Sequence, residues 1–309
     1  MDNLAILLLA LLLDAVLGEA KNSLHPVAWL GKLVSLQLNF SPQKGSVSQF
    51  IFGIIMVLAT AVLITFPLCY LLLYLRPLNS ALYILLAAYV LKVTFSIRGL
   101  WQSINTVKTH LAEGNIHNAR ITAGALVSRN TSALDSRQVI SASIESCAEN
   151  TCDSFVAPLF YFAIFGLPGA IVYRVINTFD AMIGYHGRWE YIGKFSARTD
   201  DLLNYIPARL SALLIIAASG VLRMNTKNAW QTTLRYHAAT ESPNAGWTMS
   251  AMAGSLGVQL EKPDHYRLGD DSRELTCSLI GESQNVLLLT AAIWGILLVA
   301  KEVIYLAAA

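Results

Sequence analysis

Three apolar stretches of this chain limit what it can fold into. They cover residues 50–75, 77–97 and 283–300. A helix needs about 20 mostly apolar residues to cross about 30 Å of hydrocarbon, so each stretch predicts a transmembrane helix. The composition agrees, because 55% of the 309 residues are hydrophobic, 14% are charged and the mean hydropathy is +0.51. The sequence therefore predicts an all-α polytopic membrane protein, with residues 1–309 forming a single integral membrane domain.

The first apolar segment, residues 4–17, is too short for an easy crossing and contains Asp14. It ends at Gly18, and no Lys or Arg precedes it. A cleaved signal peptide is therefore disfavoured, and we expect a short membrane-embedded helix instead.

Two other apolar segments are irregular. Residues 154–175 are broken by Gly166-Leu167-Pro168-Gly169, and residues 210–222 are short and lie between two arginines. Broken helices at membrane depth usually line a cavity. In total we expect about four to six membrane-embedded helices, some of them broken or re-entrant.

The form of residues 154–175 decides the topology. If they make a complete, kinked span, the polar segments 98–153 and 176–208 face opposite sides of the membrane. If they make a re-entrant hairpin, both segments face one side, and the many Arg and Lys residues there predict that this side is cytoplasmic. The sequence leaves both possibilities open.

Several function classes are disfavoured. The formal net charge of +2 comes from nearly balanced acids and bases, without the dense basic patch that nucleic-acid binding needs. The four cysteines show no CxxC spacing, and the six histidines form no HxxxH or HxH ligand set. No phosphate-binding loop of the G-x-x-x-x-G-K-[ST] type is present. The polar segments 98–153 and 223–282 contain no repeat and predict helical caps on the membrane core.

An acidic stripe lies in the first polar segment. Residues 136–153 predict a helix, and Glu145, Glu149 and Asp153 share one face of it at four-residue spacing. Two interpretations stay open. The stripe holds Mg²⁺ together with substrate phosphate oxygens, a ligand set that Mg²⁺ prefers. Alternatively, it faces water or pairs with neighbouring arginines, namely Arg120, Arg129 and Arg137.

A second polar group follows in Asn177-Thr178-Phe179-Asp180 and in Asp200-Asp201-Leu202-Leu203-Asn204. These N-x-x-D and D-D-x-x-N strings resemble the metal-diphosphate motifs of membrane prenyltransferases. Asn and Asp also cap helices, and this explanation is about equally favoured for each string. Nearby arginines suit phosphate binding: Arg174, Arg198 and Arg209.

Two other segments have a structural and a functional interpretation. Residues 242–246 predict a constrained turn, which either only turns the chain or presents Asn244 to an amide or phosphate. The small residues 251–257 favour close helix packing over a backbone approach to phosphate.

The order of these motifs is very similar to that of the CobD/CbiB family, the adenosylcobinamide-phosphate synthases of cobalamin biosynthesis. The similarity runs nearly end to end and includes Asp14 to Gly18, His25-Pro26-Val27, Ser128-Arg129-Asn130-Thr131, Glu145 to Asp153, Gly166 to Ala170, Asn177 to Tyr185, Asp200 to Arg209, and Ser242 to Gly246. The chain departs from the family pattern at Thr248, where the family usually has Pro, and at Glu19-Ala20, where it has Asp-Pro. The second departure lies directly after the N-terminal motif, Asp14 to Gly18.

The resemblance implies a membrane enzyme that forms an amide bond. It would join (R)-1-aminopropan-2-ol, or its O-phosphate, to the free propionate of adenosylcobyric acid, with ATP as co-substrate and Mg²⁺ as cofactor. It implies a multi-pass protein of the cell (inner) membrane, in contact with the lipid bilayer and associated there with other late cobalamin-pathway enzymes.

Combined with the residue patterns, it gives three sets of candidate site residues. The catalytic candidates are Glu145, Glu149, Asp153, Asp180, Asp200 and Asp201. The metal candidates among them are Glu149, Asp153 and Asp180. The substrate-binding candidates are His25, Arg129, Asn150, Asn177, Arg198, Asn204, Arg209 and Asn244. For His25, which precedes a proline, a helix-ending role is equally favoured.

Two alternatives belong to other classes. The first is a membrane prenyl or phosphoryl transferase, suggested by the N-x-x-D strings. The second is a non-enzymatic sensor or transporter component similar to AmpE. The intact run of motifs from Glu145 to Arg209 favours catalysis.

Overall fold

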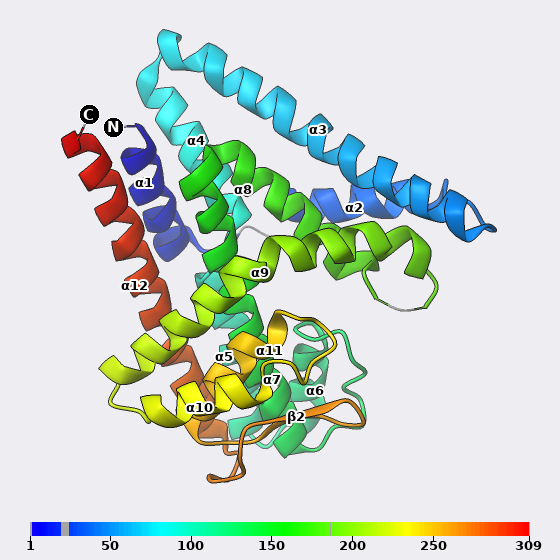
Figure 1. The fold of residues 1–309 in the computed structure, drawn as a ribbon, viewed down its shortest axis with the longest axis vertical. Coiled ribbons are helices and arrows are strands. Elements are labelled where there is room, and N and C mark those ends of the chain that lie inside the picture. Colours follow the sequence, from blue (N-terminus) through cyan, green and yellow to red (C-terminus); the bar gives the residue numbers. More distant parts are fainter. Residues whose placement is uncertain (1, 20–24, 186, 309) are drawn as a thin grey trace. The chain divides into compact units, whose positions relative to one another are not determined.

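The computed structural model describes residues 2–19, 25–185 and 187–308, and nearly all of them are helical (Figure 1). The predicted all-α class is confirmed. Within these residues, the only strands are β1 (Leu260–Lys262) and β2 (Tyr266–Leu268), which pair antiparallel. Five helical stretches of the described chain are long and apolar enough to cross a membrane, which agrees with the predicted range: Ser46–Leu78, Ser80–Ala112, Ser136–Ile183, Glu190–Val221 and Cys277–Ala308.

The chain divides into two compact units. Unit 1 comprises Met1–Ser96, Ala157–Leu203 and Leu298–Ala309, and unit 2 comprises Ile97–Val156 and Asn204–Leu297. Each unit is described here by itself, so the single domain predicted from the sequence stays a prediction.

Unit 1 is built from long apolar helices. Its elements are α1 (Asp2–Leu17), α2 (Pro26–Leu38), α3 (Ser46–Leu78), α4 (Ser80–Thr94), α8 (Ala157–Ile183), the first part of α9 (Glu190–Val221) and the end of α12 (Cys277–Ala308). Helix α1 packs on α4, while α2, α3 and α4 pack on α8. Along α3 the side chains of Ile55, Leu63 and Phe66 are 58%, 63% and 69% exposed, as expected for a surface that faces lipid.

The predicted N-terminal helices are confirmed with shifted ends. Helix α1 ends at Leu17, and the next residue, Gly18, has a left-handed φ of +65°. Glycine adopts this conformation without strain and therefore often ends a helix. The second predicted span, residues 77–97, was predicted to begin three residues before α4 begins at Ser80. Pro77 lies in the last turn of α3, and the Asn79 side chain caps α4 by accepting from the Leu82 amide at 3.0 Å.

Helix α8 is broken where the sequence predicted. Gly166 has φ +65° and ψ −157°, outside the helical region. The rings of Tyr161 and Tyr173 stack with centroids 5.4 Å apart, whereas residues 12 apart in a straight helix lie about 18 Å apart. The two limbs of α8 therefore fold back on each other (Figure 1). The fold-back agrees with the hairpin alternative, and on which side of the membrane the two flanking polar segments lie stays a prediction.

Helix α9 corrects the prediction for residues 210–222. No short separate segment begins after Arg209, because one continuous helix runs from Glu190 to Val221. Pro207 is accommodated inside it. A proline lacks the N–H that would bind the carbonyl four residues earlier, and in this helix the Leu203 carbonyl accepts instead from the Tyr161 hydroxyl at 2.9 Å.

Unit 2 carries the polar segments. Its elements are α5 (Arg98–Ala112), α6 (Ile116–Gly124), α7 (Ser136–Thr151), the π-helix η1 (Cys152–Val156), the rest of α9, α10 (Thr226–Tyr236), α11 (Ala245–Leu256), β1, β2 and most of α12. Ile104, Ile144 and Met252, from three of these helices, are fully buried in one core. The predicted helical caps are confirmed, with the β-hairpin as an addition.

Candidate functional site

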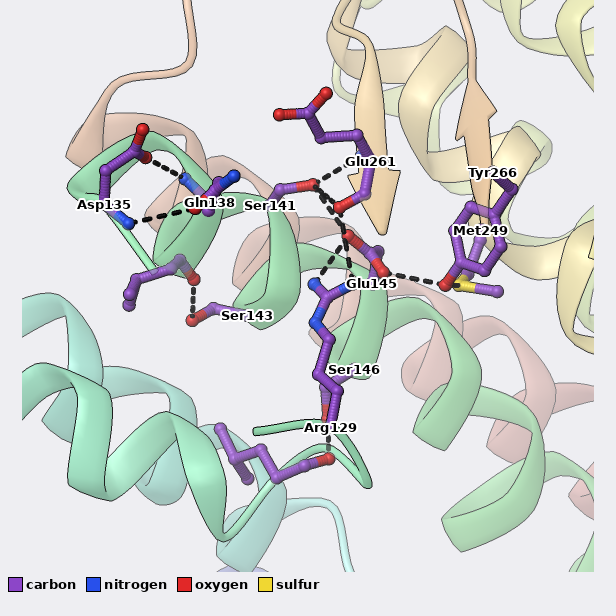
Figure 2. A network of polar contacts seen from close by, with 12 residues as sticks. Arg129, Asp135, Gln138, Ser141, Ser143, Glu145, Ser146, Met249, Glu261 and Tyr266 are labelled. Atoms are coloured by element: carbon purple, nitrogen blue, oxygen red, sulfur yellow. Dashed lines mark hydrogen bonds and ion pairs between the residues drawn. The ribbon is translucent and has the colours of Figure 1, made fainter. Parts of the chain in front are cut away.

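The carboxylate of Glu145 lies at the centre of a buried hydrogen-bond network in unit 2 (Figure 2). Its Oε1 accepts from Arg129 Nη2 at 3.1 Å and from Ser141 Oγ at 2.7 Å. Its Oε2 accepts from the Tyr266 hydroxyl at 2.8 Å. We call these four residues the Glu145 network. A buried carboxylate is costly unless it is paired and hydrogen-bonded, and here both conditions are met.

The Glu145 network also joins three parts of the chain. One turn of α7 separates Ser141 from Glu145, so both side chains lie on the same face. Ser141 Oγ accepts from the Glu261 amide of β1 at 2.8 Å, and Arg129 Nη1 donates to the Glu261 carbonyl at 3.3 Å. Helix α7, the loop that carries Arg129 and the β-hairpin are thereby fixed to one another (Figure 2).

The protonation of Tyr266 follows from its surroundings. Burial raises the pKa of Tyr266 far above its ordinary value, and the nearby charges of Glu145 and Glu149 raise it further. The phenol therefore stays protonated and acts as a donor to Glu145. Arg129 keeps one buried donor, Nε, that has no hydrogen-bond partner in the described residues.

For Glu145, these contacts decide between the two interpretations of the acidic stripe. Glu145 pairs with Arg129, which is the ion-pair alternative. Glu149 lies on the same helix, whereas Asp153 lies in the π-helix η1. The predicted helix over 136–153 thus ends at Thr151 as an α-helix, and Asp153 lies in the wider π turn that follows. Asn150 bridges the junction, donating to the Ser146 carbonyl at 3.0 Å and accepting from Ser154 Oγ at 3.1 Å.

The second polar group, apart from Asn204, lies in helices of unit 1. Asn177 on α8 donates from Nδ2 to Asp200 Oδ1 on α9 at 3.2 Å, and Arg174 Nη1 donates to Asn177 Oδ1 at 3.1 Å. Asn177 and Asp200 are both buried. Helix capping, the alternative explanation, does not apply to Asn177 and Asp200, because both lie inside their helices. For Asp180, near the end of α8, it stays open.

Three further candidates lie on the same two helices. Asp180 lies in the last turn of α8, and its carboxylate packs so closely against Gly184 that a Cβ there would collide with it. Asp201 and the exposed Arg198 lie on α9 beside Asp200.

A third group surrounds Arg209 in unit 2. The guanidinium carbon of Arg209 lies 3.6 Å from the ring centroid of Tyr205 and 4.8 Å from that of Trp247. Its Nη1 donates to Asn244 Oδ1 at 3.3 Å. The turn at 242–246 therefore does present Asn244 to another side chain. Asn204, one turn before Arg209, is buried and accepts from Cys152 Sγ at 3.8 Å.

His25 has a structural position in unit 1. It caps the start of α2, accepting from the Val27 amide at 3.2 Å. The predicted helix-ending role concerns the segment before His25, and residues 20–24 lie outside the described residues. His25 Nε2 bonds to Glu19, and Glu19 also accepts from Lys92 Nζ at 2.7 Å. Ala20, the other half of the departure from the family pattern, lies outside the described residues.

The small residues 251–257 serve helix packing, as the sequence favoured. A Cβ on Gly254 of α11 would lie 2.7 Å from the Ala229 Cα of α10. The Asn228 side chain donates to the Gly254 carbonyl at 2.8 Å across the same contact. No phosphate site is indicated there.

The two acidic groups belong to different units. Unit 1 holds Asp180, Asp200 and Asp201, and unit 2 holds the three acids of the stripe. A pocket shared by both groups stays a prediction. Within the described residues, no group of three or more His, Cys, Asp or Glu side chains is arranged to hold a metal ion.

Sequence reasoning missed several partners of these residues. Ser141 was detectable, because it precedes Glu145 by one helical turn. Tyr266 reaches Glu145, and the Glu261 backbone reaches Ser141, from more than 110 residues away in sequence, and no local pattern indicates such contacts. The same holds for Trp247 beside Arg209.

Comparison of the sequence with known proteins shows similarity to one family. The family model described as CobD/Cbib protein matches residues 7–286. The cobalamin biosynthesis protein CobD of Dehalococcoides mccartyi is 46% identical over 307 residues, covering 99% of each chain. A protein of Methanothermobacter thermautotrophicus named as a probable cobalamin biosynthesis protein CobD is 42% identical, covering 97% of this chain and 99% of its own. No solved structure matches the chain.

Proposed function

Because the chain belongs to the CobD/CbiB family, we propose that it acts in cobalamin biosynthesis as an adenosylcobinamide-phosphate synthase. The reaction joins the nitrogen of (R)-1-aminopropan-2-ol, or of its O-phosphate, to the free propionate of adenosylcobyric acid. The match to the family over residues 7–286 carries the proposal, because every candidate residue lies within it.

The chemistry explains why ATP is required. At neutral pH a carboxylate and an ammonium form a salt rather than an amide, so the acid must be activated. In the proposed sequence, the terminal phosphoryl group of ATP is transferred to a propionate oxygen and ADP leaves. The amine nitrogen then attacks the acyl carbon, inorganic phosphate leaves, and the nitrogen loses a proton to a base.

The geometry supports separate roles for the residues of unit 2. Arg129 is proposed to bind phosphate oxygens, because guanidinium groups suit them and its Nε is an unused buried donor. Glu145 holds Arg129 in place and is a positioning residue rather than the base, because hydrogen bonds occupy both of its oxygens. Glu149, on the next turn of α7, is the proposed general base.

Arg209 is proposed as a second anion-binding residue. Two aromatic rings and Asn244 hold its guanidinium, and it has no acidic partner within the described residues. Rings that stack on a guanidinium orient it without neutralising its charge. The arrangement is suited to the phosphate or carboxylate of a substrate.

Asp153, Asp180, Asp200 and Asp201 stay catalytic candidates, and Mg²⁺ stays a prediction. The described side chains do not form a metal site of their own, so no step of the reaction is assigned to a metal ion. Magnesium bound together with ATP takes phosphate oxygens and waters as most of its ligands, and its part would be to neutralise phosphate charge.

The test uses detergent-purified protein with adenosylcobyric acid, ATP, Mg²⁺ and each amine in turn, and identifies the corrinoid product by mass. We expect Glu149→Gln, which removes the proposed base, to lower the rate by about 10²-fold or more, the usual scale of general acid–base effects. Asp180→Asn tests a catalytic candidate of unit 1 and should also lower the rate. The matched control is Arg137→Gln, which removes only an exposed ion pair with Asp271.

Parental rates in both acidic variants would overturn the assigned roles. Absence of a corrinoid product with either amine would overturn the activity itself. A purified protein that carries a prenyl lipid and ignores corrinoids would support the transferase alternative.

A further inference from the structure

Helix α10 has an outer face on which two large apolar side chains are about half exposed. Its inner face, with Ala229, Thr232 and Thr233, is buried against α11. On the outer face Trp230 and Leu234 follow one another at one-turn spacing and are 45% and 51% exposed. Large exposed apolar side chains on one face of an amphipathic helix indicate a surface that meets something apolar.

The segment before α10 indicates that this apolar surrounding is a lipid bilayer. The membrane-span candidate α9 ends at Val221, four residues before the α10 cap Asn225. Val221 is 67% exposed, and Arg223 turns the chain with a left-handed φ of +58°. A helix that starts directly after a membrane span begins at the boundary between lipid and water. Tryptophan is enriched at that boundary, where its ring meets acyl chains and its N–H meets headgroups.

The charges beside this face complement a lipid headgroup. Arg223 and Lys227 are exposed and form no ion pair within residues 2–19, 25–185 and 187–308. Lys227 lies one turn before Trp230 on the same side of α10. By contrast, Arg235 lies on the far edge of the face and contacts Asp270 at 3.7 Å. Basic residues beside an apolar stripe are the pattern of helices that lie in the interface of an anionic membrane.

We infer that α10 lies in the plane of the membrane surface, with Trp230 and Leu234 among the upper acyl chains and Arg223 and Lys227 at the phosphates of anionic lipids. The inference is independent of the reaction. Its consequence is that unit 2 is held to the bilayer along α10 as well as by α9.

The experiment places a nitroxide label at residue 230, 234 or 231 of the full chain, each through a single added cysteine, in vesicles of zwitterionic lipid with or without phosphatidylglycerol. Cys147 and Cys152 are buried, and Cys69 and Cys277 are partly buried, so the labelled parent protein supplies the background. Collision with oxygen reports lipid contact, and collision with a water-soluble nickel chelate reports water contact.

We expect labels at 230 and 234 to collide more with oxygen than with the chelate, and the label at 231 to show the reverse. Lys227→Gln with Arg223→Gln should lower the oxygen preference at 230 at least twofold in phosphatidylglycerol vesicles and leave it unchanged in zwitterionic ones. Arg235→Gln is the matched control and should change neither. Equal access of the chelate to all three labels, or protection of 230 and 234 from both reagents by a protein contact, would overturn the inference.

Discussion

Both carboxylate oxygens of Glu145 accept hydrogen bonds from other side chains. Sequence spacing put this residue in one stripe with Glu149 and Asp153, yet its partners are Arg129, Ser141 and Tyr266. Breaking a buried ion pair by removing one partner leaves an uncompensated charge, which costs about 3–5 kcal/mol. A substitution at Glu145 therefore disturbs the fold of unit 2 as well as any chemistry there.

Tyr266 offers a milder change in the same network. Tyr266→Phe removes only the hydroxyl that donates to Glu145 Oε2. Hydrogen bonds to charged groups contribute about 1.5–3 kcal/mol, so we expect the free energy of unfolding to fall by about 2 kcal/mol. Urea unfolding of the detergent-solubilised protein measures this. Tyr305→Phe, at an exposed position of α12, is the control and should have no effect. An unchanged unfolding midpoint for Tyr266→Phe would contradict the network.

Glu19 shows that a departure from the family pattern can be accommodated. Burial alone would raise the pKa of Glu19, but hydrogen bonds from His25, Lys92 and Ser96 outweigh it and lower the pKa to about 2 from an ordinary 4.5. The ionised form is therefore the one that stabilises the fold. This contribution is complete above the ordinary pKa and is lost as the pH falls through the folded-state pKa.

The corresponding prediction compares the parent with Glu19→Gln across pH. We expect the variant to melt at a lower temperature at pH 7, and the gap to narrow as the pH falls from about 4.5 towards 2. Thermal unfolding followed by circular dichroism at a series of pH values measures the gap. A gap that stays constant down to pH 2 would show that Glu19 is not held in its charged form.

At the scale of elements, local sequence signals predicted where a helix is broken better than they predicted how far a helix continues. Gly166 and the proline that follows interrupt α8 as expected, because glycine and proline are the strongest breakers of a helical pattern. The sequence did not predict that α9 begins at Glu190, because Asp200, Asp201 and their polar neighbours lower the hydropathy of its first half. Polar residues still form a helix, because a helix satisfies its backbone hydrogen bonds whatever its side chains are. The π-helix η1 has no sequence signature, and yet it lies next to candidate site residues, where π turns often occur.

The packing of α10 on α11 gives a prediction at this scale. Gly254→Ala places a Cβ 2.7 Å from the Ala229 Cα, a backbone atom that cannot move alone. Overpacking of this kind costs about 1–3 kcal/mol, so we expect the melting temperature to fall. The control is Gly31→Ala in α2, where the new Cβ meets only Met182 Sδ at 3.5 Å. That variant should be neutral or slightly more stable, because alanine favours helix over glycine. Equal effects in the two variants would contradict close packing at Gly254.

At the scale of the whole molecule, the class and the family were predictable from the sequence, whereas a pocket shared by the two acidic groups stays a prediction. Hydrophobic composition and span length fix an all-α membrane protein, because in lipid a helix satisfies every backbone group internally. Motif order identified the family. Which acidic groups share a pocket depends on tertiary contacts between units 1 and 2, and sequence spacing says nothing about those. Within each unit, the pairs Arg129–Glu145 and Asn177–Asp200 were both in the candidate set. The first contact was one of the two interpretations of the acidic stripe, whereas the second was not predicted.

The hairpin in α8 makes the membrane topology testable. Because α8 turns back at Gly166, we expect Ser132, in the loop before α7, and Arg188, in the loop after α8, to face the same side of the membrane. Each is replaced by cysteine and exposed to a membrane-impermeant thiol reagent, in intact cells and in inverted vesicles. Both should react only in inverted vesicles, since the basic residues of these segments favour the cytoplasmic side. The control pair is Lys44 and Ser80, at the two ends of the straight span candidate α3, which should react from opposite sides. Reaction of positions 132 and 188 from opposite sides would mean that the chain crosses the bilayer between them, despite the turn at Gly166.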